Sequence, residues 1–94
     1  MIRSFADSDT ERIFRGLRPR KIPIQIRERG SRKLILLNAV EDLQELRVPP
    51  GNRLEKLKGD RAGQYSIRIN DQWRICFIWR EGNAYEVEIT DYHS

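Results

Sequence analysis

The strongest constraint on the fold is a run of alternating apolar and polar residues between Tyr65 and Trp79. Side chains on a β-strand point alternately to the two faces of a sheet, so this run predicts strands with one apolar and one polar face. The odd positions are apolar or aromatic, namely Tyr65, Ile67, Ile69, Trp73, Ile75, Phe77 and Trp79. The even positions include Ser66, Arg68, Asn70, Gln72 and Arg74. One face should therefore belong to the core, and the other should be polar and basic.

A turn over residues 70–72 (Asn-Asp-Gln) divides this run into the two strands of a hairpin. The loop must contain an odd number of residues if the odd positions of both strands are to share one face. A three-residue loop sets Ile67 opposite Ile75 and Arg68 opposite Arg74. Like charges directly opposite each other disfavour pairing, so this register predicts an anion between the two arginines.

The segments outside the hairpin predict helices first and further strands afterwards. Residues 2–5 are typical of a short strand, and a capping box at Ser8 and Glu11 predicts a helix over residues 8–16. A second helix should begin at Pro23, weaken at Gly30 and continue to Leu46, before the prolines at positions 49 and 50. Strands are predicted over residues 53–57, 64–70, 73–79 and 84–90. This order predicts an α+β fold in which two N-terminal helices pack on one face of a small antiparallel β-sheet.

Length and composition bound the functions that such a chain can have. Ninety-four residues predict one domain spanning residues 1–94. No apolar run approaches the roughly 20 residues needed to cross a bilayer, and no apolar leader is visible, so we expect a cytoplasmic protein without membrane contact. A single cysteine, Cys76, rules out an internal disulfide framework. One cysteine and one histidine far apart in sequence do not form a zinc site of the usual spacing, so we expect no metal or cofactor.

Positive charge is concentrated in the N-terminal part of the chain. The net charge is +4, but residues 12–33 contain nine Lys or Arg and one acid, which gives this segment a charge of +8. Such density indicates a surface that binds phosphates or an acidic partner, although a solvated helix face has the same composition. The candidate binding residues in this segment are Arg15, Arg18, Arg20 and Lys21.

Several motifs together resemble the HigB/GraT branch of the RelE-like toxins. They are MIRSF at the start, PPGNRLE, LKGDR followed by a glycine at position 63, SIRIN, QWRICF, and DYH at residues 91–93. The resemblance covers nearly the whole chain. It implies a RelE-like fold and the toxin of a type II toxin–antitoxin system, acting as a ribosome-dependent endoribonuclease on mRNA in the A site.

The resemblance also implies roles for particular residues. Lys58, in LKGD, matches a catalytic lysine, and Arg74, in WRI, matches the arginine that holds the scissile phosphate. Tyr92 and His93, in DYH, are the candidate proton donors. Glu55 stands where better-known HigB sequences have a histidine, which leaves a weakly basic carboxylate as the candidate base. Further candidates for contact with RNA are Arg61 and Arg68.

The chemistry implied is metal-free attack of an RNA 2′-hydroxyl on the adjacent phosphorus. The implied partners are a cognate HigA-like helix-turn-helix antitoxin, the ribosome and mRNA, with operator DNA reached only through the antitoxin. Two alternatives remain open, a non-catalytic RNA- or antitoxin-binding relative and a DNA-binding accessory protein. An enzyme requires Lys58, Arg74 and Tyr92 to converge around one phosphate-sized site, whereas Arg74 in a pure binder could simply pair with Glu86 or Glu88.

Overall fold

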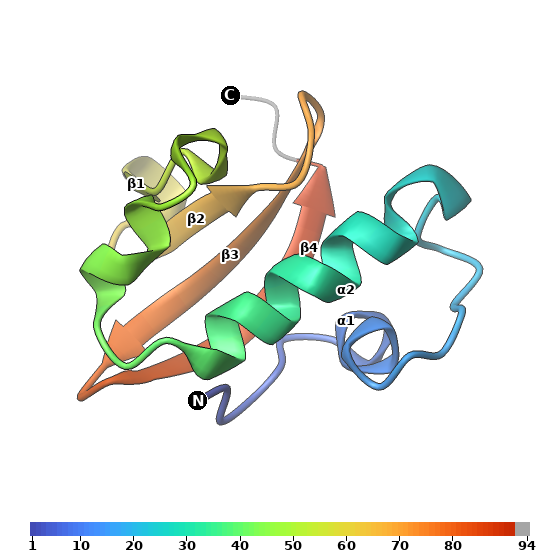
Figure 1. Ribbon diagram of the computed structural model, residues 1–94, viewed down its shortest axis with the longest axis horizontal. Coiled ribbons are helices and arrows are strands. Elements are labelled where there is room, and N and C mark those ends of the chain that lie inside the picture. Colours follow the sequence, from blue (N-terminus) through green and yellow to red (C-terminus); the bar gives the residue numbers. More distant parts are fainter. Residues whose placement is uncertain (92–94) are drawn as a thin grey trace.

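The structure is a computed structural model, and it describes residues 1–91. Two α-helices come first, and four strands and three short 3₁₀ helices follow (Figure 1). The α-helices are α1 (Ser8–Phe14) and α2 (Ile24–Ala39), and the 3₁₀ helices are η1 (Leu43–Arg47), η2 (Pro50–Asn52) and η3 (Gly59–Arg61). The strands are β1 (Glu55–Lys56), β2 (Tyr65–Arg68), β3 (Trp73–Arg80) and β4 (Asn83–Asp91).

The four strands form one antiparallel sheet in the order β1-β2-β3-β4. The predicted hairpin register is confirmed, with Ile67 opposite Ile75 and Arg68 opposite Arg74. The side-chain oxygen of Asn70 fixes the three-residue turn by accepting hydrogen bonds from the backbone N–H groups of Gln72 and Trp73, at 2.8 and 2.7 Å. An asparagine that bonds its own turn in this way is a common means of closing a short loop.

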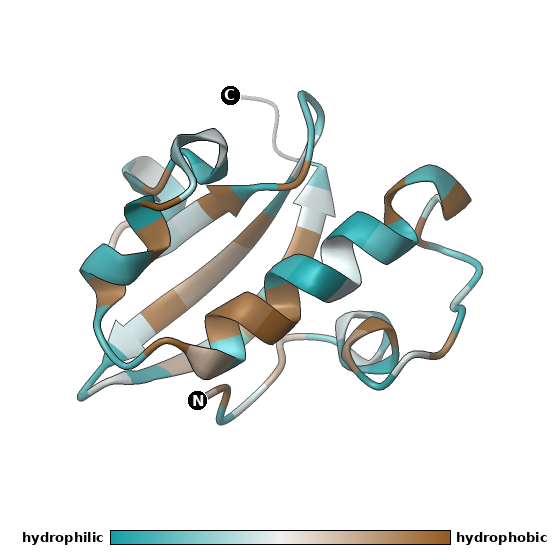
Figure 2. Cartoon of the chain, in the orientation of Figure 1, coloured by the Kyte–Doolittle hydropathy of each residue, from teal (hydrophilic) through white to brown (hydrophobic). Residues whose placement is uncertain are grey.

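The odd-numbered face of the hairpin lies in the core, as the alternation predicts. Ile67, Ile75 and Phe77 are fully buried beneath α2, which crosses the sheet (Figure 1). The apolar residues of the strands lie behind the equally apolar second half of this helix (Figure 2). The α+β fold with two N-terminal helices on one face of the sheet is therefore confirmed.

The predicted weakening of the second helix at Gly30 is wrong.

 The bounds of the helix are Ile24–Ala39, and it continues through the glycine without a break. A β-carbon at position 30 would lie 3.4 and 3.6 Å from the side chains of Ile89 and Ile69. The glycine therefore lets α2 approach the sheet closely, which outweighs its low intrinsic helix propensity.

The second helix ends earlier than its apolar periodicity predicts. The structure ends α2 at Ala39 and starts the separate 3₁₀ helix η1 at Leu43. Asp42 and Glu45 form a capping box that begins this new helix. Local capping competes with helix continuation there, while Leu46 still reaches the core and is fully buried. At the first helix, the capping residue is Asp7, whose carboxylate accepts from the Thr10 N–H at 2.6 Å, and not the predicted Ser8.

The edges of the sheet also differ from the prediction. Ile2 and Phe5 form isolated parallel bridges with Ala84 and Val87 and no continuous first strand. The strand predicted over residues 53–57 is reduced to the two residues of β1. A register shift opposite residues 76–78 and a positive φ of 52° at Glu86 mark a β-bulge in β4. Within residues 1–91, no helix is long and apolar enough to cross a membrane.

Candidate functional site

The best-defined polar group on the even-numbered face of the sheet is the guanidinium of Arg74. Its Nε donates to Ser66 Oγ at 2.8 Å, and its Nη2 donates to the backbone carbonyl of Arg53 at 2.7 Å. Only 12% of the side chain is exposed. Planar guanidinium groups bonded on two edges are well fixed in orientation, so Arg74 is held in place before any ligand arrives.

Glu55 lies beside this guanidinium. Its Oε1 is 3.9 Å from Arg74 Nη1, and 54% of its side chain is exposed. Strand pairing accounts for the position, because Glu55 lies opposite Ser66, the residue to which Arg74 is bonded. The Glu55 carboxylate is near enough to be attracted by the guanidinium charge, but it forms no close hydrogen bond with Arg74 and stays half-exposed to a ligand. An ionised carboxylate in this position can accept a proton from a substrate.

A second arginine lies near the first on the same face. Arg61 Nη1 donates to Gln64 at 3.0 Å and forms an ion pair with Glu88 at 3.2 Å. Arg61, Glu88 and Arg74 all influence the buried thiol of Cys76, whose pKa is raised above its usual value, chiefly by burial. Glu88 thus pairs with Arg61, and Arg74 does not form the pair with Glu86 or Glu88 that was the alternative interpretation.

Sequence reasoning did not single out Glu88 as part of the site. The pairing of Glu88 with Cys76 places it on the even-numbered face of the sheet. The bulge in β4 breaks the simple alternation that would have indicated this position. Cys76 and Ser66 are both fully buried, so part of this face is covered and is less open than predicted.

Lys58 lies between β1 and η3, where it is the residue that precedes the short η3 helix. It is exposed, and within residues 1–91 its ammonium group forms no hydrogen bond or ion pair. Its charge is therefore available to a ligand. Tyr92 and His93, the candidate proton donors, lie outside the described residues.

Arg68 and Arg74 are directly opposite each other, but their guanidinium groups have separate partners. Arg68 forms a short hydrogen-bonded ion pair with Asp71 in the turn. This hydrogen bond lowers the pKa of Asp71 below its usual range. Arg74 instead bonds Ser66 and the loop at Arg53. Groups of the protein therefore relieve part of the like-charge repulsion between the two arginines.

The basic segment lies with the helices and away from the polar sheet face. Arg15, at the end of α1, already pairs with Glu11 at 2.9 Å. Arg18, Arg20 and Lys21 follow in the connection to α2. The structure does not bring these four residues together with Arg74 and Glu55, because the helices cover the opposite, odd-numbered face.

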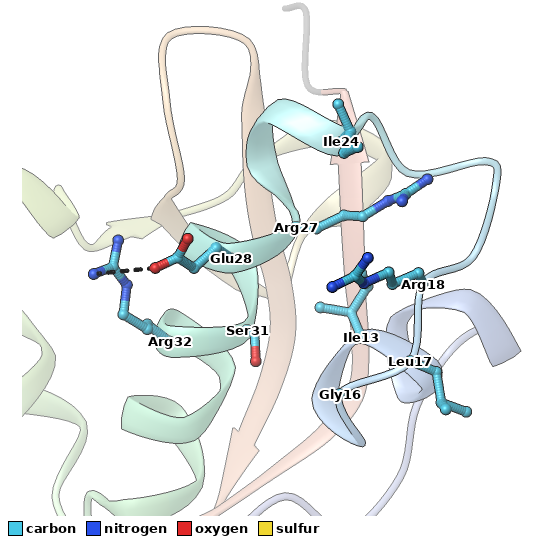
Figure 3. Close-up of a pocket in the computed structure, with 9 residues that line it drawn as sticks. All are labelled: Ile13, Gly16, Leu17, Arg18, Ile24, Arg27, Glu28, Ser31 and Arg32. Carbon is cyan, nitrogen blue, oxygen red and sulfur yellow. Dashed lines mark ion pairs between the residues drawn. The ribbon is translucent and has the colours of Figure 1, made fainter.

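A groove of about 450 Å³ lies between the end of α1 and the start of α2 (Figure 3). Leu17 and Ile24 line it and are unusually exposed for apolar residues, at 55% and 69%. Arg18 and Arg27 contribute positive charge to the same groove. The sequence indicated the charge of this surface but not its apolar groove, because that depends on how the two helices pack.

Among residues 1–91, no cluster of three or more His, Cys, Asp or Glu side chains could hold a metal ion. The sheet itself presents the polar side chains described above. They include the fixed positive charge of Arg74, the positive charge of Arg61 and the half-exposed carboxylate of Glu55, and Lys58 adds an exposed ammonium group in the loop before η3. Such a set can bind a phosphodiester and stabilise negative charge that develops on it.

The fold and the sequence both have known counterparts. A solved chain of the YoeB-YefM complex from Staphylococcus aureus has the same fold, with a TM-score of 0.56 and 17% identity over 100% of this chain and 99% of that one. Toxin HigB-1 of Vibrio cholerae is 41% identical over 85 residues, which cover 89% of this chain and 90% of that protein. Endoribonuclease HigB of Proteus vulgaris is 32% identical over 93 residues, covering 99% and 100%.

The family model described as the RelE-like toxin of the type II toxin-antitoxin system HigB matches residues 3–93. This match covers almost the entire chain, and it agrees with the two HigB proteins at 41% and 32% identity. The resemblance inferred from the sequence motifs is confirmed. The chain belongs to the HigB-like family of RelE-type toxins of type II toxin–antitoxin systems.

Proposed function

We propose that this toxin is an endoribonuclease that cleaves mRNA in the ribosomal A site. The observation that carries the proposal is the fixed guanidinium of Arg74, bonded by Ser66 and the Arg53 carbonyl and placed beside the exposed carboxylate of Glu55. The similar protein from Proteus vulgaris is named an endoribonuclease, which supports the same reaction here.

The reaction is attack of a 2′-hydroxyl on the neighbouring phosphorus. The bond between the 2′-oxygen and phosphorus forms, the bond from phosphorus to the 5′-oxygen breaks, and the products are a 2′,3′-cyclic phosphate and a 5′-hydroxyl. Glu55 accepts the proton of the 2′-hydroxyl, and Tyr92 or His93 supplies a proton to the leaving 5′-oxygen. Proton transfer of this kind contributes about 10²–10⁴-fold to the rate.

Arg74 and Lys58 stabilise the charge that develops on the phosphoryl oxygens. Nε of Arg74 donates to Ser66 and Nη2 donates to the Arg53 carbonyl, which leaves the Nη1 donors, 3.9 Å from Glu55 Oε1, for the phosphate. Lys58 adds a mobile point charge. Arg61 and Arg68 contact RNA phosphates on either side of this centre. No metal or cofactor takes part.

The ribosome completes this site. A carboxylate is a weak base where better-known relatives have a histidine, so the reaction depends on a substrate that is already held in the reactive geometry. Correct orientation of reacting groups can lower the barrier by roughly 7–11 kcal/mol. A codon fixed in the A site provides such a substrate, whereas free RNA does not.

Other surfaces of the chain bind its partners in the cytoplasm. Arg15, Arg18, Arg20 and Lys21 contact phosphates of ribosomal RNA. A HigA-like helix-turn-helix antitoxin neutralises the toxin, and operator DNA is reached only through that antitoxin. A non-catalytic relative that keeps the antitoxin or RNA surface is the alternative.

Induction of the toxin in a bacterial host tests the proposal. Wild-type protein should arrest growth, and Lys58→Ala should relieve the arrest while the protein stays folded, because Lys58 is exposed. Lys56→Ala is the matched control, since it removes the same charge from the adjacent strand β1 at a position paired with Tyr65. Equal growth arrest by Lys58→Ala and wild type would contradict the assignment. A wild-type protein that binds its antitoxin without arresting growth would support the non-catalytic alternative.

A further inference from the structure

Asn52 is a fully buried polar residue to which neither the sequence motifs nor the mechanism assigns a role. Both ends of its side-chain amide are hydrogen-bonded. Its Nδ2 donates to the backbone carbonyls of Leu46 and Val48, each at 3.2 Å. Its Oδ1 accepts a short hydrogen bond from Nζ of Lys33 on α2. Buried amides are retained only when they are bonded in this way, so Asn52 joins η1, the following loop and α2.

Arg53, the next residue, has a left-handed backbone with a φ of 45°. A non-glycine residue in this region is strained and persists only when its surroundings hold it there. Two backbone hydrogen bonds help to hold Arg53 in this conformation. Asn52 N–H donates to the Pro49 carbonyl at 3.0 Å, and Arg53 N–H donates to the Pro50 carbonyl at 3.1 Å. The buried amide of Asn52 anchors the same loop from within. The direction of the Arg53 carbonyl therefore depends on Asn52.

That carbonyl accepts the hydrogen bond from Nη2 of Arg74. A continuous chain of contacts thus runs from Lys33 through Asn52 and the backbone of Arg53 to the guanidinium of Arg74. The side chain of Arg53 has no part in it, because only the carbonyl is used.

We propose that Asn52 is a positioning residue that sets the orientation of the Arg74 guanidinium through the Arg53 carbonyl, with Lys33 tying the loop to α2. The proposal rests on the role of Arg74 in the proposed function. Displacement of a catalytic group by about 1 Å can cost about 10²-fold in rate, so a residue that reaches the phosphate only through Arg53 and Arg74 can control the chemical step.

The Nε–H group of Arg74 offers a readout that does not depend on activity. Its hydrogen bond to Ser66 Oγ should give a protected signal in ¹⁵N NMR spectra, assigned by its loss in Arg74→Lys. Asn52→Ala should shift or abolish this signal, and Lys33→Met should shift it in the same direction. Asn38→Ala is the matched control, because Asn38, on α2, also carries a side-chain amide, whose Oδ1 accepts from the Ile2 N–H at 2.9 Å, away from Arg74.

Single-turnover cleavage of mRNA on programmed ribosomes provides the second readout. Asn52→Ala should slow cleavage at saturating protein by tenfold or more, with unchanged ribosome affinity, while Asn38→Ala should alter only thermal stability. An Arg74 signal and a cleavage rate that both stay at wild-type values in Asn52→Ala would overturn the proposal. If Asn52→Ala does not fold, Lys33→Met serves as the test in its place. An unchanged Arg74 Nε–H signal in Lys33→Met would then overturn the proposal. A wild-type protein that does not cleave RNA would refute the proposed function, while the NMR signal would still decide how Arg74 is positioned.

Discussion

The backbone carbonyl of Arg53 accepts a hydrogen bond from Nη2 of Arg74 at 2.7 Å, although the two residues are 21 positions apart. Arg53 lies in the loop that follows η2, and Arg74 lies in the central strand β3. Together with Ser66 on β2, this contact determines the direction of the guanidinium. The orientation of the central cation therefore depends on a loop as well as on the sheet.

Arg74→Lys should slow cleavage strongly while keeping the positive charge. A lysine cannot bond Ser66 and the Arg53 carbonyl at once and still present a planar pair of donors to phosphate. Loss of one such preorganised donor typically costs about 10²–10³-fold in rate. Arg80→Lys is a suitable control, because Arg80 lies at the end of the same strand over the ring of Tyr85. Single-turnover cleavage measures both variants, and equal rates for Arg74→Lys and wild type would exclude the proposed role.

Glu55 should behave as a proton acceptor. Glu55→Gln keeps the shape of the side chain but removes its basic group, so cleavage should fall by about 10²–10⁴-fold. Glu55→His should retain activity, because histidine is the better base at this position. Since more than half of the Glu55 side chain is exposed, thermal stability should change little in either variant. Unaltered cleavage by Glu55→Gln would show that another group takes the proton.

Neutralising the basic segment should weaken binding rather than chemistry. Arg18, Arg20 and Lys21 changed together to Gln should lower ribosome affinity and flatten its salt dependence by roughly 0.7–0.9 decades per tenfold salt for each lost phosphate contact. Arg15→Gln should have a smaller effect, because Arg15 already pairs with Glu11. Cleavage at saturating protein should survive. Normal ribosome binding combined with loss of antitoxin binding would assign this surface to the antitoxin instead.

The stability contributed by Lys33 should depend on pH. Burial, aided by Arg29 and Arg32, lowers the pKa of Lys33 below that of a free lysine. As pH rises, the native state therefore loses this proton before the unfolded state does, and stability increases while the unfolded chain holds more protons. The free energy of unfolding of wild type, relative to Lys33→Met, should rise between the lowered and the ordinary pKa of lysine. Chemical denaturation measures this difference in the free energy of unfolding. A difference that stays constant or falls across that pH range would contradict the prediction.

Local patterns in the sequence were sufficient to predict the central hairpin of the sheet, but not its edges. The alternation from Tyr65 to Trp79 and the Asn70 turn specify the hairpin register, because a shift by one residue would expose Ile67 and Ile75. Apolar periodicity did not predict the end of α2, because Leu46 is an apolar core position both in one continuous helix and in a separate helix that begins at Leu43. Only the capping box at Asp42 and Glu45 distinguishes these two structures.

The site was predictable only in part. The motifs predict roles for Arg74, Glu55 and Lys58, but they do not indicate the hydrogen-bond partners of Arg74. A backbone carbonyl such as that of Arg53 leaves no side-chain signal in a sequence, and its direction depends on a left-handed residue after a buried amide. The groove near Leu17 and Ile24 depends likewise on helix packing, which periodicity does not specify.

Cleavage of one mRNA, either free or on a programmed ribosome, tests the central claim most directly. We predict cuts within the A-site codon, a 2′,3′-cyclic phosphate and a 5′-hydroxyl at the new ends, and little cleavage of the free RNA. Lys58→Ala should reduce these cuts, and Lys56→Ala should not. Cleavage of free RNA as fast as ribosome-bound RNA, or new ends of a different chemistry, would contradict the account.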